Sequence, residues 1–304
     1  NPAIVSNQVI AAALYGTQHP YGYPQIGTEA SIKAADRDAM VAFWKQNFVP
    51  NNAALVVAGN ISESELRSLA EKEFGSWQQG TPARPDLGAP TTTSAKLVLV
   101  DKPGAQQTYL RVGRVAVPRS TPDFAPLEVM NMQLGGLFSS RINLNLREEH
   151  GYTYGASSFF DYRRSAGPFQ VVAPVRTDVT AAALGEIFKE LSRMADTPMT
   201  PDELKLSIDS QVRSLPGQFE TSANAAGSYA NIYIYNLGLD YYAKLPARLN
   251  GVTAAAAQAV AKKYLALEQM LVVAVGDRAK IEPDLFKLNL SPVESRDPDG
   301  KPKP

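Results

Sequence analysis

The sequence contains no cysteine, and histidine occurs only twice among its 304 residues. Without cysteine there is no thiol catalysis, no disulfide bond and no cysteine-ligated metal site. A cysteine-free chain is compatible with a reducing or an oxidising compartment, so this absence does not locate the protein in the cell. The scarcity of histidine also narrows the kinds of metal site that the chain can build by itself.

The chain also lacks net charge and long apolar runs. Its 30 basic and 30 acidic residues cancel, so the charge balance gives no indication of a nucleic-acid partner. No uninterrupted apolar run approaches the roughly 18 residues that a membrane span requires. The first residue is Asn, with no basic and apolar leader before it. We therefore expect that any targeting segment has been removed or lies upstream, and that the chain is a piece of something longer.

Two stretches rich in proline or glycine divide the chain. The segment 81–95 shows neither helical nor strand periodicity, which is typical of an interdomain linker. The segment 291–304 is polar and proline-rich, which predicts a flexible tail. The expected domains are therefore residues 1–80 and 96–290, and the length allows each to have its own core.

The ends of these two domains resemble each other. The sequence MVAFWKQNFVPNNAALVVAGN at 40–60 and AQAVAKKYLALEQMLVVAVGD at 257–277 share one layout. Each predicts a helix, a short polar break and a buried strand beginning L-V-V-A. A helix followed by a buried strand is common, so the match could arise by chance. If it is a duplication, the chain holds two homologous α+β domains of helices packed on a mostly antiparallel sheet, and the first domain is incomplete.

Local signals predict where several elements begin. Ser62 with Glu65, and Thr200 with Glu203, form capping-box patterns that start helices. A helix is predicted over 139–149 and a strand over 153–162, so the segment NLREEHGYTYGAS at 145–157 joins a helix to a strand.

The cluster Glu148, Glu149 and His150 in this segment raises the question of a zinc site. A zinc-binding helix of the H-x-x-E-H kind needs two histidines four residues apart on one face. The residue four positions before His150 is Leu146, which has no lone pair to offer. His19 lies in a loop segment far away in sequence and fits a hydrogen-bonding role. We expect no metal ligand in this chain, and a helix-end role for His150.

The segment LGGLFSSRINLNLREEHGYTYGASS at 134–158 resembles the second, non-zinc domain of the pitrilysin/insulinase family of zinc metallopeptidases. The likeness is nearest to bacterial members related to mitochondrial processing peptidase. The segments 19–32 and 48–62 resemble the latter part of that family's first domain. The resemblance implies two homologous domains that close around a peptide. It also implies that the H-x-x-E-H helix precedes Asn1, so that the complete enzyme, and not this chain, binds zinc.

The resemblance assigns an arginine and a tyrosine, here Arg147 and Tyr154, to the substrate. In zinc-assisted peptide hydrolysis a phenol can stabilise the charge on the carbonyl oxygen, and a guanidinium can hold a backbone carbonyl. From spacing alone, a surface ion pair for Arg147 and sheet packing for Tyr154 are the better explanation, because charged and aromatic pairs are common. The surrounding motif favours the substrate role instead.

The function implied is that of the C-terminal part of a zinc metalloendopeptidase, supplying substrate and transition-state contacts but no metal ligands. This chain alone is then inactive. Its partners would be a peptide substrate and either the missing N-terminal half-domain or a homologous zinc-binding subunit, with a dimer possible. The alternative is a non-catalytic homologue that serves as partner or scaffold of an active peptidase. Bacterial periplasm and cytoplasm both remain open.

Overall fold

The computed structural model describes residues 1–84 and 86–303, and the chain divides into two compact units. The first unit comprises Asn1–Pro24, Gly88–Val212 and Ala243–Pro304, and the second comprises Gln25–Leu87 and Arg213–Tyr242. Among the described residues, no helix combines the length and the apolar character needed to cross a bilayer.

The first unit is built on a six-stranded sheet with the order β3-β4-β2-β5-β1-β6. Pairing is antiparallel from β3 to β5 in this order, and parallel between β5 and β1 and between β1 and β6. This confirms the predicted α+β class with a mostly antiparallel sheet. The strands are β1 (Leu97–Asp101), β2 (Gln107–Val115), β3 (Ser157–Phe160), β4 (Pro168–Arg176), β5 (Leu271–Gly276) and β6 (Val293–Ser295).

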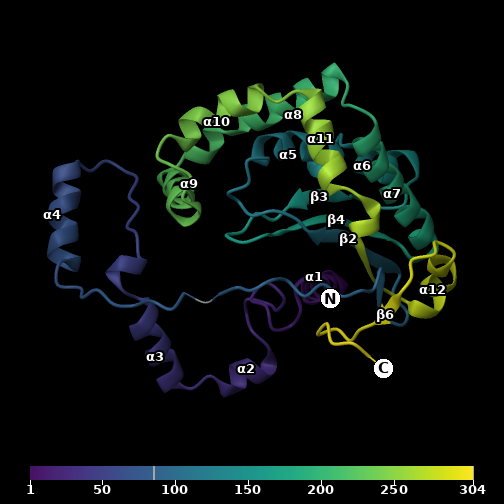
Figure 1. Ribbon diagram of the computed structural model, residues 1–304, viewed down its shortest axis with the longest axis horizontal. Coiled ribbons are helices and arrows are strands. Elements are labelled where there is room, and N and C mark those ends of the chain that lie inside the picture. The colour runs from purple at the N-terminus through teal and green to yellow at the C-terminus, as the bar shows by residue number, and fades with distance from the viewer. Residues whose placement is uncertain (85, 304) are drawn as a thin grey trace. The chain divides into compact units, whose positions relative to one another are not determined.

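Helices cover one face of this sheet (Figure 1). The even-numbered residues of β2 face them, as shown by the hydrogen bond of 2.8 Å from Thr180 Oγ1 to Thr108 Oγ1. Leu110 and Val112 on the same side are fully buried. The helices of this layer and its margin are α5 (Phe124–Asn131), α6 (Arg141–Asn143), α7 (Thr180–Asp196), α8 (Pro201–Ser214), α10 (Tyr241–Asn250), α11 (Ala254–Tyr264) and α12 (Arg278–Phe286).

The N-terminal helix α1 (Pro2–Tyr15) packs on the other face of the sheet (Figure 1). Its apolar residues Val9, Ile10 and Leu14 form one core cluster with Val98 of β1 and Val273 of β5. Fully burying one such side chain contributes about 1.5–3 kcal/mol. A single helix therefore covers the part of this face formed by β2, β5 and β1, whereas Phe159 of β3 is 37% exposed.

The flexible tail predicted over 291–304 is wrong for its first part. Val293–Ser295 forms β6, which pairs with β1 in parallel. Arg296 is buried, and its guanidinium donates to Glu294 Oε1 at 2.6 Å and to the Gly300 carbonyl at 3.0 Å. A three-residue strand in a proline-rich segment carries too weak a periodicity to be predicted, but the free edge of β1 supplies hydrogen-bond partners for its backbone.

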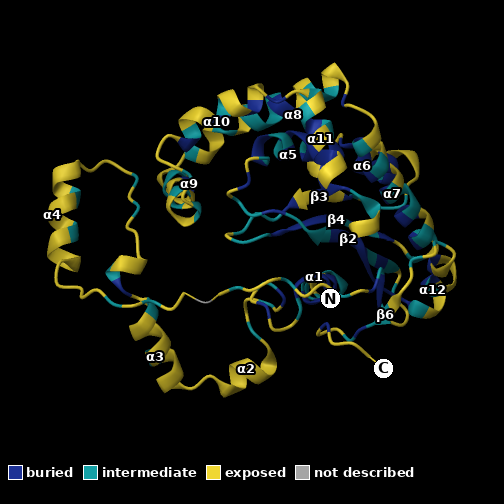
Figure 2. Ribbon diagram, viewed as in Figure 1, coloured by how far each residue is buried: buried dark blue, intermediate teal, exposed yellow. Residues whose placement is uncertain are grey.

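The second unit contains α2 (Glu29–Ala34), α3 (Arg37–Asn47), α4 (Glu63–Phe74) and α9 (Ser222–Tyr235). The predicted capping box of α4 is present, because Ser62 and Glu65 exchange hydrogen bonds. None of the residues of α2, α3 and α4, all of which lie in the described part of the chain, is buried (Figure 2). Short turns of 3₁₀ helix occur in both units, at Pro50–Asn52 and Pro216–Phe219 in the second and at Thr177–Val179 and Leu267–Gln269 in the first.

The buried strand predicted within 51–60 is wrong. These residues continue from a 3₁₀ turn into irregular chain, and Leu55 and Val57 are 59% and 41% exposed. The matching L-V-V-A of the second copy is β5, which is paired on both edges and fully buried. The two segments differ because β5 has neighbouring strands to pair with and the segment 55–58 has none in the described structure. A strand needs hydrogen-bond partners on its edges and packing on its faces.

Candidate functional site

Arg147 lies on a π-helix, η3 (Leu144–Glu149), which continues directly from α6. The wider winding appears in the hydrogen bond of 3.1 Å from the His150 N–H to the Asn145 carbonyl, five residues back. The helix predicted over 139–149 is therefore confirmed as helical chain from residue 141, with a π segment that periodicity does not reveal. Single π turns are found frequently at functional sites because they re-aim the side chains that they carry.

The Arg147 side chain is partly exposed and contacts Phe138 and Glu148. Its guanidinium carbon lies 4.5 Å from the centre of the Phe138 ring, and its Nε lies 3.2 Å from Glu148 Oε1. The Phe138 ring is itself largely exposed. Arg147 thus combines a stacking contact that limits its orientation with guanidinium nitrogens that remain available to a ligand.

Tyr154 is 89% exposed, and its hydroxyl makes no hydrogen bond to any residue that the structure describes. The backbone around it is held firmly. The Tyr152 N–H donates to the Leu146 carbonyl at 2.8 Å, and Thr153 Oγ1 donates to the Pro174 carbonyl at 2.5 Å. A free phenol on a restrained loop can donate a hydrogen bond to a ligand without first breaking one of its own.

Asn143 connects the segments that carry these residues, and sequence analysis did not single it out. Its side chain is buried; Nδ2 donates to the Phe138 carbonyl at 2.7 Å, and Oδ1 accepts from the Ala156 N–H at 3.0 Å. One carboxamide therefore ties the Phe138 loop to the chain that follows Tyr154. Its position, four residues before Arg147 on the predicted helix, was the one available signal.

Within the described residues, no hydrogen bond, ion pair or ring contact joins Arg147 to Tyr154. The structure places both on neighbouring, mutually anchored segments. Their convergence on one ligand stays a prediction.

Gly135 allows the hallmark segment, residues 134–158, to pack closely on the sheet. A Cβ at this position would lie 2.3 Å from the Ser158 N atom and 2.4 Å from Ser158 Oγ. Ser158 is on β3, and its carbonyl and hydroxyl also bond to Asn131 of α5. A side chain at 135 would push the π-helix η2 (Met132–Gly136) away from β3 and disturb the loop before Arg147.

The inner side of η3 is anchored on α7. Asn145 is buried, and its Nδ2 donates to Glu186 Oε2 and to Glu190 Oε1, each at 2.9 Å. The hydrogen bond from Asn145 is the main reason that the pKa of Glu186 is lowered. His150 stacks on Tyr152 with ring centres 4.8 Å apart, and its Nε2 lies 3.9 Å from Glu186 Oε2.

A buried ion pair anchors the start of the same helix. Arg141 donates to Glu203 of α8 through Nε at 2.8 Å and through Nη2 at 2.7 Å. The Arg141 side chain is only 5% exposed, whereas that of Glu203 is 21% exposed. Burial would raise the pKa of Glu203, but hydrogen bonds donated by Arg141 and Thr200 outweigh it and lower the pKa.

His19 is buried in a different environment. Its Nδ1 accepts a hydrogen bond of 3.0 Å from the Tyr21 N–H, and its ring contacts those of Tyr15 and Tyr21. Burial, together with the Arg163 guanidinium, lowers the pKa of His19. These partners place His19 in a hydrogen-bonded turn.

The chain's own residues do not fit a zinc ion. His19 lies among aromatic rings, with a guanidinium as its nearest charge, and His150 stacks on a tyrosine beside a single carboxylate. Across residues 1–84 and 86–303, no group of three or more His, Cys, Asp or Glu side chains is placed to hold a metal. Any metal-dependent step requires ligands other than these.

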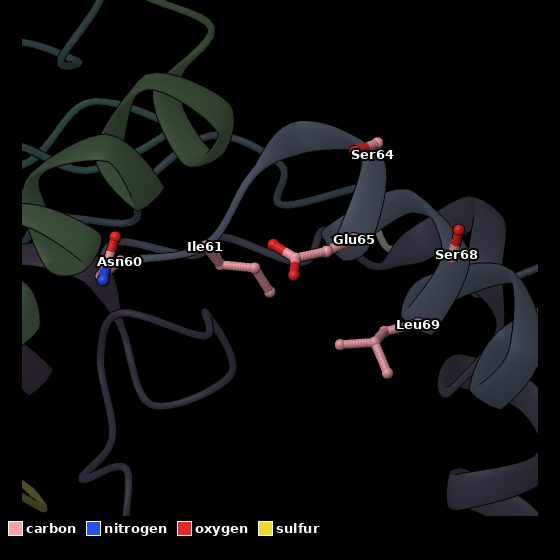
Figure 3. Close-up of a pocket in the computed structure, with 6 residues that line it drawn as sticks. All are labelled: Asn60, Ile61, Ser64, Glu65, Ser68 and Leu69. Carbon is pink, nitrogen blue, oxygen red and sulfur yellow. The ribbon is translucent and has the colours of Figure 1, made fainter.

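A shallow hollow of about 570 Å³ lies at the start of α4 in the second unit (Figure 3). Glu65 is the charged residue in its lining, but its Oε2 accepts hydrogen bonds from the Ser62 N–H and hydroxyl. These bonds lower the pKa of Glu65 and commit the carboxylate to the helix cap. The hollow therefore offers no free acid or base.

A family model described as the peptidase M16 inactive domain matches residues 34–210. An uncharacterized zinc protease of Mycobacterium leprae is 28% identical over 211 residues, which cover 68% of this chain and 47% of that protein. An uncharacterized zinc protease of Bacillus subtilis is 26% identical over 221 residues, covering 73% and 53%. The chain thus spans about half the length of the curated relatives that it matches.

Solved structures share the fold. The crystal structure of a peptidase M16 inactive domain from Pseudomonas fluorescens superposes with a TM-score of 0.82 at 26% identity, covering 91% of this chain and 65% of that one. A protease from Helicobacter pylori superposes with a TM-score of 0.75 at 21% identity, covering 89% and 65%, which is a likeness of fold alone.

Proposed function

The chain belongs to the peptidase M16 inactive-domain family, as the hallmark segment indicated, and from this we propose that it forms the substrate-contacting part of a zinc-dependent peptidase. Its relatives carry the name zinc protease. The hydrolytic metal would be held outside this chain, in an N-terminal half-domain or on a homologous subunit.

The observation that carries this proposal is the state of Tyr154. Its side chain is exposed and its hydroxyl makes no hydrogen bond to the described residues, while its backbone is tied to η3 and β4 before it and to Asn143 of α6 after it. Peptide hydrolysis develops negative charge on the carbonyl oxygen, and a preorganised donor stabilises that charge without reorganisation. Arg147, oriented by Phe138, would hold a neighbouring backbone carbonyl of the same peptide.

The sheet edge beside the Tyr154 loop is partly occupied. β3 ends the described sheet and begins three residues after Tyr154. The Asp161 N–H donates to the Pro168 carbonyl, so the even-numbered residues of β3 turn their backbone groups away from β4, and the Ser158 carbonyl there already accepts a hydrogen bond from Asn131 Nδ2. A peptide held by Tyr154 would therefore pass close to β3 without adding a full strand to it.

The need for a partner is supported by the second unit. Large apolar side chains on α3 and α4 stand in solvent, among them Phe43 at 63%, Trp44 at 57% and Leu69 at 50% exposed. Exposed apolar surface of this extent marks an interaction site. The complementary part would be the missing zinc-bearing half-domain or a homologous subunit, and two-chain assembly is compatible with either.

A non-catalytic partner or scaffold role is the second candidate, since the lack of a metal-holding cluster across the described ranges fits both roles. Metal analysis separates the candidates. Zinc at one equivalent in the purified assembly, together with an H-x-x-E-H sequence upstream in the gene, fits the peptidase, whereas their absence from every subunit fits the scaffold.

The direct test is Tyr154→Phe in the assembled, zinc-loaded protein. We expect turnover of an unstructured peptide to fall by about 10²-fold, as for the loss of one oxyanion donor, with little change in KM. Tyr233→Phe is the matched control, since that side chain is also exposed, at 52%, and is far along the chain from the loop. Equal turnover in wild type and Tyr154→Phe would remove Tyr154 from the mechanism.

A further inference from the structure

A buried arginine lies in the sheet on the side that α1 covers. Arg111 of β2 is 9% exposed, and its Nε donates to Ser6 Oγ of α1 at 2.9 Å. Its Nη1 donates to Gln170 Oε1 of β4 at 2.7 Å, and Gln170 is 6% exposed. The Arg111 side chain thus joins the helix to two strands, and both of its partners are neutral.

Each of these two side chains keeps one unused donor. Arg111 Nη2 and Gln170 Nε2 make no hydrogen bond within the described residues, and neither belongs to the buried unpaired atoms. Both nitrogens therefore retain access to solvent. The amide orientation of Gln170 is fixed, because its oxygen must face the guanidinium and its nitrogen must point elsewhere.

Among the described residues, no carboxylate pairs with the Arg111 guanidinium. α1 carries no charged residue along its length, and neither does β3. Burial alone lowers the pKa of Arg111 to about 10, with no acidic neighbour acting against it. A guanidinium in this position is a cation that has lost much of its hydration without gaining an anion.

The space beside the pair depends on Gly113. It lies directly opposite Gln170 in the β2–β4 register, and a Cβ here would meet the Phe169 carbonyl at 2.5 Å and Gln170 Cγ at 3.1 Å. The absent side chain lets Gln170 lie flat along the sheet and reach Arg111. The sequence therefore favours this pair over a packed apolar contact.

We propose that Arg111 and Gln170 bind a carboxylate of a peptide, either an acidic side chain or a chain terminus, through Arg111 Nη2 and Gln170 Nε2. This inference rests on the proposed peptide-binding function and adds an acidic preference to it. Two donors, one of them charged, match the two oxygens of a carboxylate.

The bound carboxylate belongs to a part of the peptide beyond the Tyr154 loop. Neighbouring strands are spaced by about 4.8 Å, so β3, which follows that loop, lies roughly 10 Å from β2, further than a glutamate side chain extends. Phe159 of β3, on the same face as Gln170, is 37% exposed, and the peptide would continue from the loop across this part of the face.

The test uses the full chain and labelled, unstructured peptides, with binding followed by fluorescence anisotropy at low salt. One peptide is blocked at both ends and has a central Glu, a second has Gln instead, and a third has Gln and a free C-terminal carboxylate. We expect the wild type to bind the first or the third about tenfold more tightly than the second. The tighter of the two identifies the source of the carboxylate.

Three variants complete the test. Arg111→Gln should bind all peptides equally, and so should Gln170→Glu, which places a carboxylate beside Arg111. Gln170→Glu keeps the guanidinium and its contact with Ser6, so it decides the matter if Arg111→Gln unfolds. Arg114→Gln is the matched control, because Arg114 is also a partly buried arginine of β2 and points to the opposite face, and it should keep the preference.

The outcomes separate this inference from the function on which it rests. Equal binding of all three peptides to the wild type overturns the acidic preference and leaves peptide binding intact. Loss of the preference in Arg114→Gln as well overturns it, because general charge would then be the cause. No binding of any peptide overturns both.

Discussion

At the scale of single residues, the hallmark segment is held by polar side chains that are themselves buried. Arg141, Asn143 and Asn145 are each at most 6% exposed, and they bond to α8, to the Tyr154 loop and to α7 respectively. Buried polar groups reduce stability unless they are hydrogen-bonded. Each of these contacts therefore both stabilises the fold and holds the segment in one position. The exposed ends of Arg147 and Tyr154 project from this fixed base.

The Arg141–Glu203 pair should be the most sensitive of these contacts. Glu203→Gln removes the counter-ion of a guanidinium that cannot reach solvent. We expect unfolding to become easier by about 2 kcal/mol, less than for a fully enclosed pair because Glu203 keeps some exposure. Urea unfolding followed by circular dichroism measures this loss. Asp178→Asn, which removes an exposed partner of Arg176, should change little.

The same pair gives stability a defined pH dependence. The pKa of Glu203 is lower in the folded chain than its ordinary value of 4.5, so its contribution is complete above that pH. It is lost as the pH falls from 4.5 through the lowered folded value, because over this interval the unfolded state binds a proton that the folded state does not. Glu203→Gln should lack this part of the acid-induced loss. An unchanged acid limb in the variant would show that other carboxylates control it.

Sequence reasoning reached Arg147 and Tyr154 through a motif, and it missed the residues that support them. In the sequence, Asn143 and Asn145 are polar residues of a predicted helix with no special pattern. Only the structure shows that their side chains are buried. The Arg111–Gln170 pair was invisible for a similar reason, since the two residues are 59 positions apart and meet only through the β2–β4 register.

At the scale of elements, local sequence signals predicted most helices and strands. Whether the remaining segments formed strands depended on the availability of a neighbouring strand. The capping boxes at Ser62 and Thr200 are present as predicted. The L-V-V-A at 55–58 and the L-V-V-A of β5 carry the same local information, yet only the second is a strand. Likewise β6 exists because β1 offers an edge, which its own composition could not indicate.

The helix α1 is the element on which one face of the sheet depends. Ile10→Ala should destabilise the first unit by about 3 kcal/mol, because Ile10 is fully buried against β1 and β5 and its loss leaves a cavity. Thermal and urea unfolding measure the effect. Ile4→Ala on the same helix is the control, since Ile4 is 58% exposed and should change stability little. Equal effects at the two positions would contradict the packing described.

At the scale of the whole molecule, the two units differ in how much each buries. The first buries most of its sheet between α1 and the other helices, whereas α2, α3 and α4 of the second present no buried residue in the described structure. Hydrogen bonds in such helices open to solvent locally, without global unfolding.

Hydrogen exchange should separate the units. Amides of α3 and α4 should exchange far faster than those of β5, which is buried throughout, and α1 should be protected like the sheet. Mass spectrometry of timed deuterium uptake gives the comparison within one sample. Addition of the zinc-bearing partner should slow exchange in α3 and α4 if it covers them. Slow exchange in the isolated chain would show that these helices are stable by themselves.

The exposed stretch from Leu55 to Ala58 has a consequence for behaviour in concentrated solution. Its residues are apolar and rich in valine, without charge or proline, which is the composition of segments that stack into fibrils. In β5 the same residues form backbone hydrogen bonds with the neighbouring strands β1 and β2. Where Leu55–Ala58 is exposed, the identical segment of another molecule is the nearest strand with which it can pair. A segment with the composition of a buried strand therefore makes the isolated chain prone to self-association.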